Sequence, residues 1–69
     1  MQYKVVERNH DKATGHVANK VVLYQGASAQ DAVKVYNGPH TLPFGEKSFY
    51  AGRKLLYAYQ LYDLPKEER

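Results

Sequence analysis

The chain has 69 residues, a formal net charge of +3 at pH 7 and no cysteine. Its length fits one domain, close to the lower size at which a hydrophobic core holds without help. Without cysteine, disulfides and thiolate metal sites are excluded, and a small secreted protein usually carries disulfides. The sequence shows neither a run of about 18 apolar residues nor an apolar signal peptide. We therefore expect a soluble, cytoplasmic protein that does not cross a membrane.

Two segments near the N-terminus have the composition of β-strands. Residues 2–10 mix tyrosine and valine with charged side chains, and residues 16–25 are rich in valine, leucine and tyrosine. The segment between them, residues 11–15, ends in Gly15, and glycine takes a positive φ without steric cost. This pattern predicts an antiparallel β-hairpin.

The register of the hairpin decides which side chains share a face. If His10 lies opposite His16, Val5 faces Val21, and one face of the hairpin is apolar while the other is mixed. A bulge at the loop would shift the register by one residue and exchange the two faces. The sequence leaves both registers open.

Residues 28–36 carry a dense set of helix signals. Ser28 is a suitable N-cap, and Asp31 follows it at the third helical position. Four apolar residues recur at the spacing of one helix face: Ala29, Ala32, Val33 and Tyr36. Gly38 then offers a left-handed cap before Pro39. A helix this short does not persist alone, so its apolar stripe must pack on the hairpin.

The next segment contains two chain breakers and is expected to form a loop. It spans residues 40–47, with Leu42 and Phe44 pointing inward. After it, the sequence allows two interpretations. Ser48 caps a further helix, or residues 47–50 form a short third strand.

Residues 53–64 are dense in large side chains, with four leucines and three of the seven tyrosines. Good helix formers dominate there, and no β-branched residue follows Thr41, so the segment is predicted to be a helix that ends before Pro65. The preference of tyrosine for sheets keeps a strand open as the alternative. The predicted fold is α+β, a hairpin packed by a short helix (ββα) plus a C-terminal Tyr/Leu-rich helix or third strand. We expect a single domain over residues 1–64 and a frayed charged tail over residues 65–69.

Catalytic and metal-binding chemistry finds little support in the sequence. His10 and His16 flank the hairpin loop, but their spacing matches no zinc signature, and a structural zinc site needs four ligands. Ser28 is accounted for as a cap, and no nucleophile elbow pairs a serine with His40. The glycines occur singly and form no phosphate-binding loop. We predict neither an enzyme nor a cofactor or metal site.

The tyrosines favour a protein-binding function. Seven are too many for so small a core, because each buried hydroxyl needs a hydrogen-bond partner. Tyrosine and arginine are also typical of interface hot spots. The predicted protein-binding residues are Tyr57, Leu61 and Tyr24, with Arg53 and Lys54 at the rim. The partner is another protein, which this chain engages as a small adaptor or inhibitor, or a second copy in a homodimer. So short and self-contained a chain would suit a phage or a mobile element.

The hairpin supports an alternative function in nucleic-acid binding. A two-stranded ribbon fits the major groove of DNA. The candidate phosphate contacts are Lys4, Arg8, Lys12 and Lys20. The competing interpretation is that these charges only solvate one face of the sheet and protect its edges.

Overall fold

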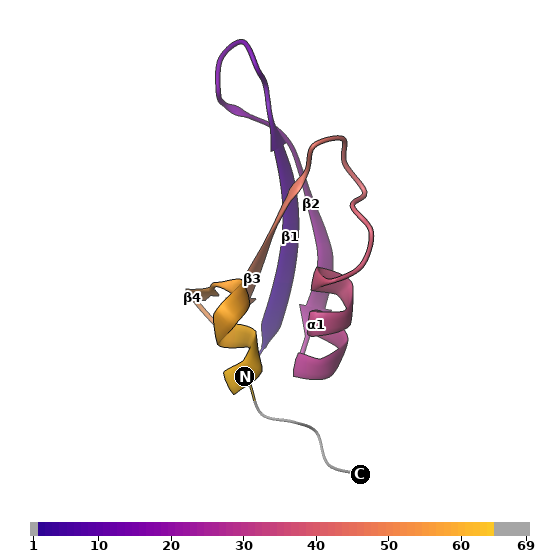
Figure 1. Ribbon diagram of the computed structural model, residues 1–69, viewed down its shortest axis with the longest axis vertical. Helices are drawn as coiled ribbons and strands as arrows, with labels where there is room; N and C mark the ends of the chain where they lie inside the picture. Colours follow the sequence, from indigo (N-terminus) through magenta and orange to yellow (C-terminus); the bar gives the residue numbers. More distant parts are fainter. Residues whose placement is uncertain (1, 65–69) are drawn as a thin grey trace.

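The structure, a computed structural model, describes residues 2–64 and shows a four-stranded antiparallel sheet with one α-helix packed against it (Figure 1). The elements in chain order are β1 (Tyr3–His10), β2 (Val17–Gly26), α1 (Ala29–Tyr36), β3 (Glu46–Ala51), β4 (Lys54–Leu56) and the 3₁₀ helix η1 (Ala58–Asp63). The strand order across the sheet is β2-β1-β3-β4. The predicted α+β class is confirmed. The predicted tail, residues 65–69, lies outside the described residues.

The β1–β2 hairpin forms where it was predicted, but its register differs. Val5 pairs with Tyr24 and His10 pairs with Val17, so the predicted pairing of Val5 with Val21 is wrong. Gly15 takes the positive φ that the loop requires, at +74°. The hairpin tip projects beyond the rest of the molecule (Figure 1).

The difference in register has two sources: His10 pairs with Val17 rather than His16 at the loop, a shift of one residue, and two bulges in β2 add one residue each. The pairing shifts between Val5 and Val6 and again between Asn9 and His10, which leaves Leu23 as the extra residue at the first shift. Bulges of this kind interrupt the outer hydrogen-bonding row of an edge strand. A single inserted residue leaves the composition of a strand unchanged, so the valine-rich pattern predicts the strand but not its bulges.

The hydrophobic core lies between α1 and one face of the sheet. It consists of Tyr3, Val5, Ala29, Ala32, Phe49 and Leu56. The Phe49 ring lies at its centre, 6.1 Å from the Tyr3 ring and 5.9 Å from the Tyr36 ring. Full burial of a side chain such as Phe49 contributes roughly 1.5–3 kcal/mol. The predicted apolar stripe of α1 therefore packs on the sheet as expected.

The N-terminus of α1 is capped as the sequence predicts. The Ser28 side chain accepts a hydrogen bond from the backbone N–H of Asp31 at 3.2 Å. The sheet adds a second contact, because the backbone N–H of Ser28 donates to the Tyr24 hydroxyl at 3.2 Å. The start of the helix is thus tied to β2 as well as to its own cap.

The C-terminus of α1 is held by a lysine rather than by a left-handed glycine. The C-cap Asn37 has ordinary right-handed dihedrals, and Gly38 takes no positive φ, so the predicted glycine cap is wrong. Lys47 of β3 instead donates hydrogen bonds to the carbonyl oxygens of Val35 and Gly38. A cation at this end also complements the helix dipole.

The C-terminal Tyr/Leu-rich segment is split between a strand and a 3₁₀ helix. Residues 54–56 pair with β3, so the helix prediction is wrong for this part and the strand alternative holds. Gly52, with φ +63°, occupies the first central position of a two-residue turn, which suits a type II′ hairpin. Pairing with β3 therefore overrides local helix propensity. The predicted stop before Pro65 is confirmed, since Leu64 is extended with ψ 146°.

None of the helices within residues 2–64 is long and apolar enough to cross a membrane.

Candidate binding surfaces

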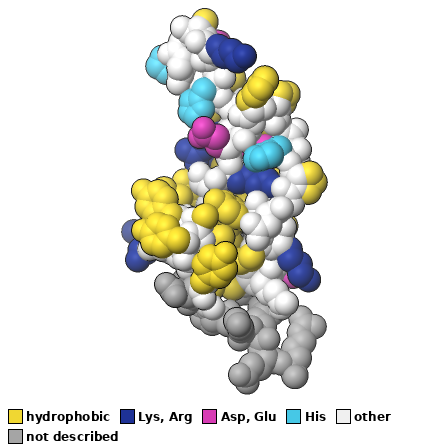
Figure 2. All heavy atoms as spheres, in the orientation of Figure 1, with side chains coloured by type: hydrophobic (Ala, Val, Ile, Leu, Met, Phe, Trp, Pro, Cys, Tyr) yellow, Lys and Arg dark blue, Asp and Glu magenta, His cyan; other side chains and the backbone are white. Residues whose placement is uncertain are grey.

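Three tyrosines of the C-terminal segment form an exposed surface, which we call the tyrosine surface: Tyr57, Tyr59 and Tyr62. Their side chains are 60%, 70% and 88% exposed. The rings of Tyr57 and Tyr59 stack in parallel, with centroids 6.1 Å apart and planes 2° apart. Figure 2 shows hydrophobic side chains gathered over the half of the molecule where η1 lies.

The geometry of η1 decides which side chains face outward. A 3₁₀ helix has about three residues per turn, so side chains at i and i+3 lie on the same side. Leu61 and Leu64 share one side and pack against the core, while Tyr59 and Tyr62 share the other and are exposed. In an α-helix of 3.6 residues per turn, Leu61 would share the outward side with Tyr57, which is why the sequence predicts Leu61 as a contact residue. The structure instead places Leu61 half-buried, beneath the tyrosine surface.

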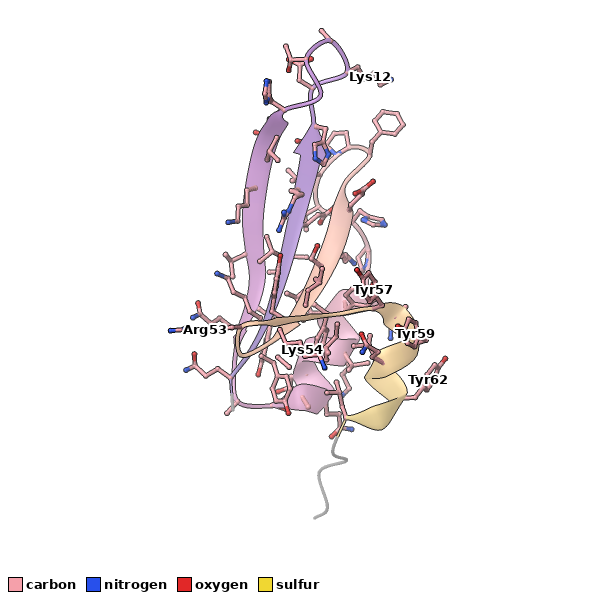
Figure 3. All side chains as sticks on the ribbon, turned by 90° about the vertical axis from the view of Figure 1, so that its left-hand side faces the viewer. Lys12, Arg53, Lys54, Tyr57, Tyr59 and Tyr62 are labelled. Carbon is pink, nitrogen blue, oxygen red and sulfur yellow. The ribbon has the colours of Figure 1, made fainter. Side chains whose placement is uncertain are left out.

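The two predicted rim cations lie next to the tyrosine surface in the chain. Arg53 and Lys54 are exposed in the turn and first residue that lead into β4 (Figure 3). Tyr24 does not join them, because it belongs to β2 at the opposite edge of the sheet. Its ring is half-buried and its hydroxyl is engaged at the start of α1. Of the five predicted contact residues, Tyr57, Arg53 and Lys54 are exposed, and Figure 3 shows Arg53 at the far end of β4 from Tyr57.

A buried carboxylate forms a second site that the sequence did not reveal. Glu7 is 0% exposed and lies on the α1 side of β1. It accepts hydrogen bonds from the Thr41 backbone N–H and hydroxyl, both at 2.8 Å, and from the Leu42 N–H at 3.3 Å. The Nδ1 atom of His40 lies 3.1 Å from Glu7 Oε2 and carries the hydrogen there, since an ionised carboxylate only accepts. We call Glu7 and the three residues that donate to it, His40, Thr41 and Leu42, the Glu7 cradle.

The Glu7 cradle stabilises the ionised carboxylate. Burial alone would raise the pKa of Glu7, but the hydrogen bonds from Thr41, Leu42 and His40 outweigh burial and lower the pKa from 4.5 to about 2. Gly45 closes the cradle, because a Cβ at this position would come within 1.9 Å of Glu7 Oε2. The carboxylate is fully enclosed, so its arrangement supports a structural role for Glu7 rather than contact with a ligand.

The loop that encloses Glu7 presents an exposed aromatic ring. Phe44 is 86% exposed, so the prediction that it points inward is wrong. Its φ of +54° and the hydrogen bond from Gly45 N–H to the Leu42 carbonyl at 3.1 Å define a tight turn with Pro43 and Phe44 at its centre. Positive φ at the third position of such a turn normally requires glycine. The Lys12 ammonium from the hairpin tip lies 4.8 Å from the Phe44 ring centroid.

The four cations of the nucleic-acid hypothesis fall in two places. Lys4 and Arg8 alternate on β1 away from α1, and Arg8 pairs with Lys20 of β2, so these three share the face of the sheet opposite α1, which we call the open face. Lys12 lies apart from them at the hairpin tip, beside the Phe44 ring.

The histidines lie in separate settings. His10 and His16 are exposed near the hairpin tip, while His40 contacts Glu7. Within the described part of the chain, no group of three or more histidine, aspartate or glutamate side chains is arranged to hold a metal ion.

Comparisons with protein-family models, curated proteins and solved structures found no significant match to this chain.

Proposed function

We propose that this protein is a non-catalytic binding module, an adaptor or inhibitor, that engages another protein through the tyrosine surface. The observation that carries the proposal is the exposure of Tyr57, Tyr59 and Tyr62, at 60–88%, in a chain that buries its core without them. Contiguous exposed apolar side chains on a small domain more often mark an interaction site than an accident of the fold.

The composition of the surface suits an interface hot spot. A tyrosine ring offers a large contact area, a polar hydroxyl and only two side-chain torsions to fix on binding. The parallel stack of Tyr57 and Tyr59 already restricts two of the rings. Hot-spot residues of this type typically cost about 2 kcal/mol or more of binding free energy when they are truncated.

The neighbouring charges suggest the kind of partner. Arg53 and Lys54 are both exposed, and neither forms an ion pair with the side chains that the structure describes, those of residues 2–62 and 64. A partner surface with an apolar centre and acidic residues at its rim would complement this arrangement and be attracted to it over a distance. We therefore propose an acidic-rimmed protein groove as the contact.

The proposal is tested by affinity capture from the native host with the wild-type chain and a Tyr57→Ala/Tyr59→Ala/Tyr62→Ala variant. Bound proteins are identified by mass spectrometry after nuclease treatment, and far-UV circular dichroism checks the fold. Phe44→Ala is the control, because it removes an exposed ring that lies beside Lys12 of the hairpin loop, at the other end of β3 from the tyrosine surface. A partner that binds the wild type and Phe44→Ala but not the triple variant supports the proposal. Equal capture by all three chains contradicts it.

Self-association through the same surface is tested separately. A homodimer buries the tyrosine surface against a second copy, so sedimentation of the purified wild type should then depend on concentration. The triple variant should remain monomeric over the same range. A concentration-dependent dimer that survives the triple substitution would place the dimer interface elsewhere.

A further inference from the structure

The open face of the sheet combines positive charge with apolar surface. Three rows of side chains cross it from β2 through β1 to β3: Lys20, Arg8 and Glu46; Val22, Val6 and Ser48; Gln25, Lys4 and Tyr50. The rows hold three cations and one carboxylate, a net charge of +2. Leu55 of β4 extends the last row.

The Arg8 side chain is half-buried and contacts a neighbour on this face. Its Nη2 donates to the Tyr50 hydroxyl at 3.0 Å, although the row of Val6 lies between the two residues. Val6 is 1% exposed, consistent with its coverage by the Arg8 and Tyr50 side chains. A guanidinium that is already ordered loses less side-chain entropy when it binds an anion.

The cations of the open face are not neutralised by contacts within the described chain. Lys4, Arg8 and Lys20 form no ion pair with any side chain described, those of residues 2–62 and 64. About four residues of β-strand, the separation of Lys4 and Arg8, span roughly 13 Å. Two of the three cations, Lys4 and Arg8, therefore lie along β1, and the third, Lys20, lies beside Arg8 on β2.

We propose that the open face binds single-stranded nucleic acid, with Lys4, Arg8 and Lys20 contacting phosphates. Charge complementarity favours a polyanion, and the apolar side chains between the cations favour a single strand over a duplex. Val22 and Leu55 remain 47% and 41% exposed, and Tyr50 offers a ring beside them. Unpaired bases cover such surfaces by stacking and apolar contact, whereas a duplex presents mainly phosphates. This site is distinct from the tyrosine surface and does not depend on the function proposed for it.

The test is fluorescence anisotropy with labelled oligo-dT and oligo-U of about 12 nucleotides. Three phosphate contacts predict that the affinity falls roughly 20-fold between about 50 mM and 200 mM salt, because each contact contributes about 0.7 to the slope of log K against log salt. In a Lys4→Gln/Lys20→Gln variant, one contact remains and the fall shrinks to roughly 3-fold. Comparison of the two oligonucleotides distinguishes DNA from RNA.

The matched control is Lys12→Gln/Lys34→Gln, which removes the same charge from the hairpin tip and from the exposed side of α1. This control should keep the full salt dependence of the wild type. The proposal is overturned if the wild type binds neither oligonucleotide at low salt, or if the control weakens binding as much as Lys4→Gln/Lys20→Gln. Tighter binding of a duplex of the same length would overturn the assignment of a single strand.

Discussion

The Glu7 cradle and the tyrosine surface differ in what they expose to solvent: the cradle buries a charged side chain, and the tyrosine surface exposes large aromatic ones. In the cradle, a charged group is 0% exposed, and both of its oxygens accept hydrogen bonds. In the tyrosine surface, three of the largest side chains are exposed and stabilise little beyond a ring stack. The cradle therefore stabilises the fold, whereas the tyrosine surface is where we propose that a partner binds. Substitutions in the two regions should separate stability from binding.

The largest loss of stability is expected from Gly45→Ala. The new Cβ would meet Glu7 Oε2 at 1.9 Å and Glu7 Cδ at 2.7 Å, so the loop or the carboxylate must move. Overpacking of this kind costs about 1–3 kcal/mol. The free energy of unfolding from urea denaturation measures the effect. Gly38→Ala is the control, because its Cβ meets no atom closer than 3.3 Å, and a loss as large there would contradict the close-packing argument.

Acid should lower the free energy of unfolding, because Glu7 is ionised in the folded protein. The folded pKa of Glu7, about 2, lies below the ordinary value of 4.5, so the folded state holds its charge while the unfolded state takes up a proton. The stabilisation is complete above pH 4.5 and is lost as the pH falls towards 2. Urea midpoints measured across this interval should fall steeply in the wild type.

Glu7→Gln sharpens the same prediction. Glutamine keeps the shape of the side chain but removes the charge, so the variant is less stable at neutral pH and loses less on acidification. Glu46→Gln, which removes an exposed carboxylate, should retain the steep acid limb. An acid limb that is unchanged in Glu7→Gln would show that the cradle does not control acid stability.

At Phe44, replacement by glycine rather than alanine is expected to stabilise the protein, by less than Gly45→Ala destabilises it. Left-handed dihedrals cost a residue with a Cβ about 1–2 kcal/mol, and glycine avoids this cost. Phe44→Gly should therefore be more stable than Phe44→Ala by about 1 kcal/mol, since both remove the ring and only glycine relieves the backbone. Thermal unfolding of the two variants measures the difference. Equal stability would mean that φ of +54° carries no strain at this turn.

The smallest effect on stability is expected in the tyrosine surface. Tyr59→Ala and Tyr62→Ala remove rings that are 70% and 88% exposed, and each should change the free energy of unfolding by no more than about 0.5 kcal/mol. Leu61→Ala, one position away and packed against the core, should cost about 1–2 kcal/mol. Equal losses at all three positions would show that the tyrosines support the fold rather than a partner.

Elements with a regular side-chain period were predictable from the sequence. The alternation in residues 3–10 and the capped apolar stripe of residues 28–36 gave the hairpin and α1 at nearly their observed limits. Features that depend on contacts between segments distant in the chain were not predictable from the sequence. The Glu7 carboxylate meets Thr41, 34 residues away, and a lone glutamate in a strand looks the same whether it faces water or a loop.

The candidate surfaces were predictable in part, and the helix type explains what was missed. Tyr57 is exposed as the sequence predicts, but an α-helix of 3.6 residues per turn would place Tyr59 and Tyr62 on the side that faces the core. The 3₁₀ period moves both outward and turns Leu61 inward. The grouping of Lys4, Arg8 and Lys20 on one face follows already from the predicted register, in which Lys20 lies opposite Val6. The observed register keeps Lys20 on that face and moves it opposite Arg8.

The attachment of η1 to the core affects the dynamics of the whole C-terminal segment. Leu61 and Leu64, which attach η1 to the core, are only half-buried. We therefore expect η1 to detach from the core at a lower free energy of opening than the strands of the sheet. Backbone amides of η1 should exchange with solvent deuterium well before those of β1. A partner that clamps the tyrosine rings would slow this exchange, and so hydrogen exchange would report occupancy of the surface even where the partner leaves the sheet untouched.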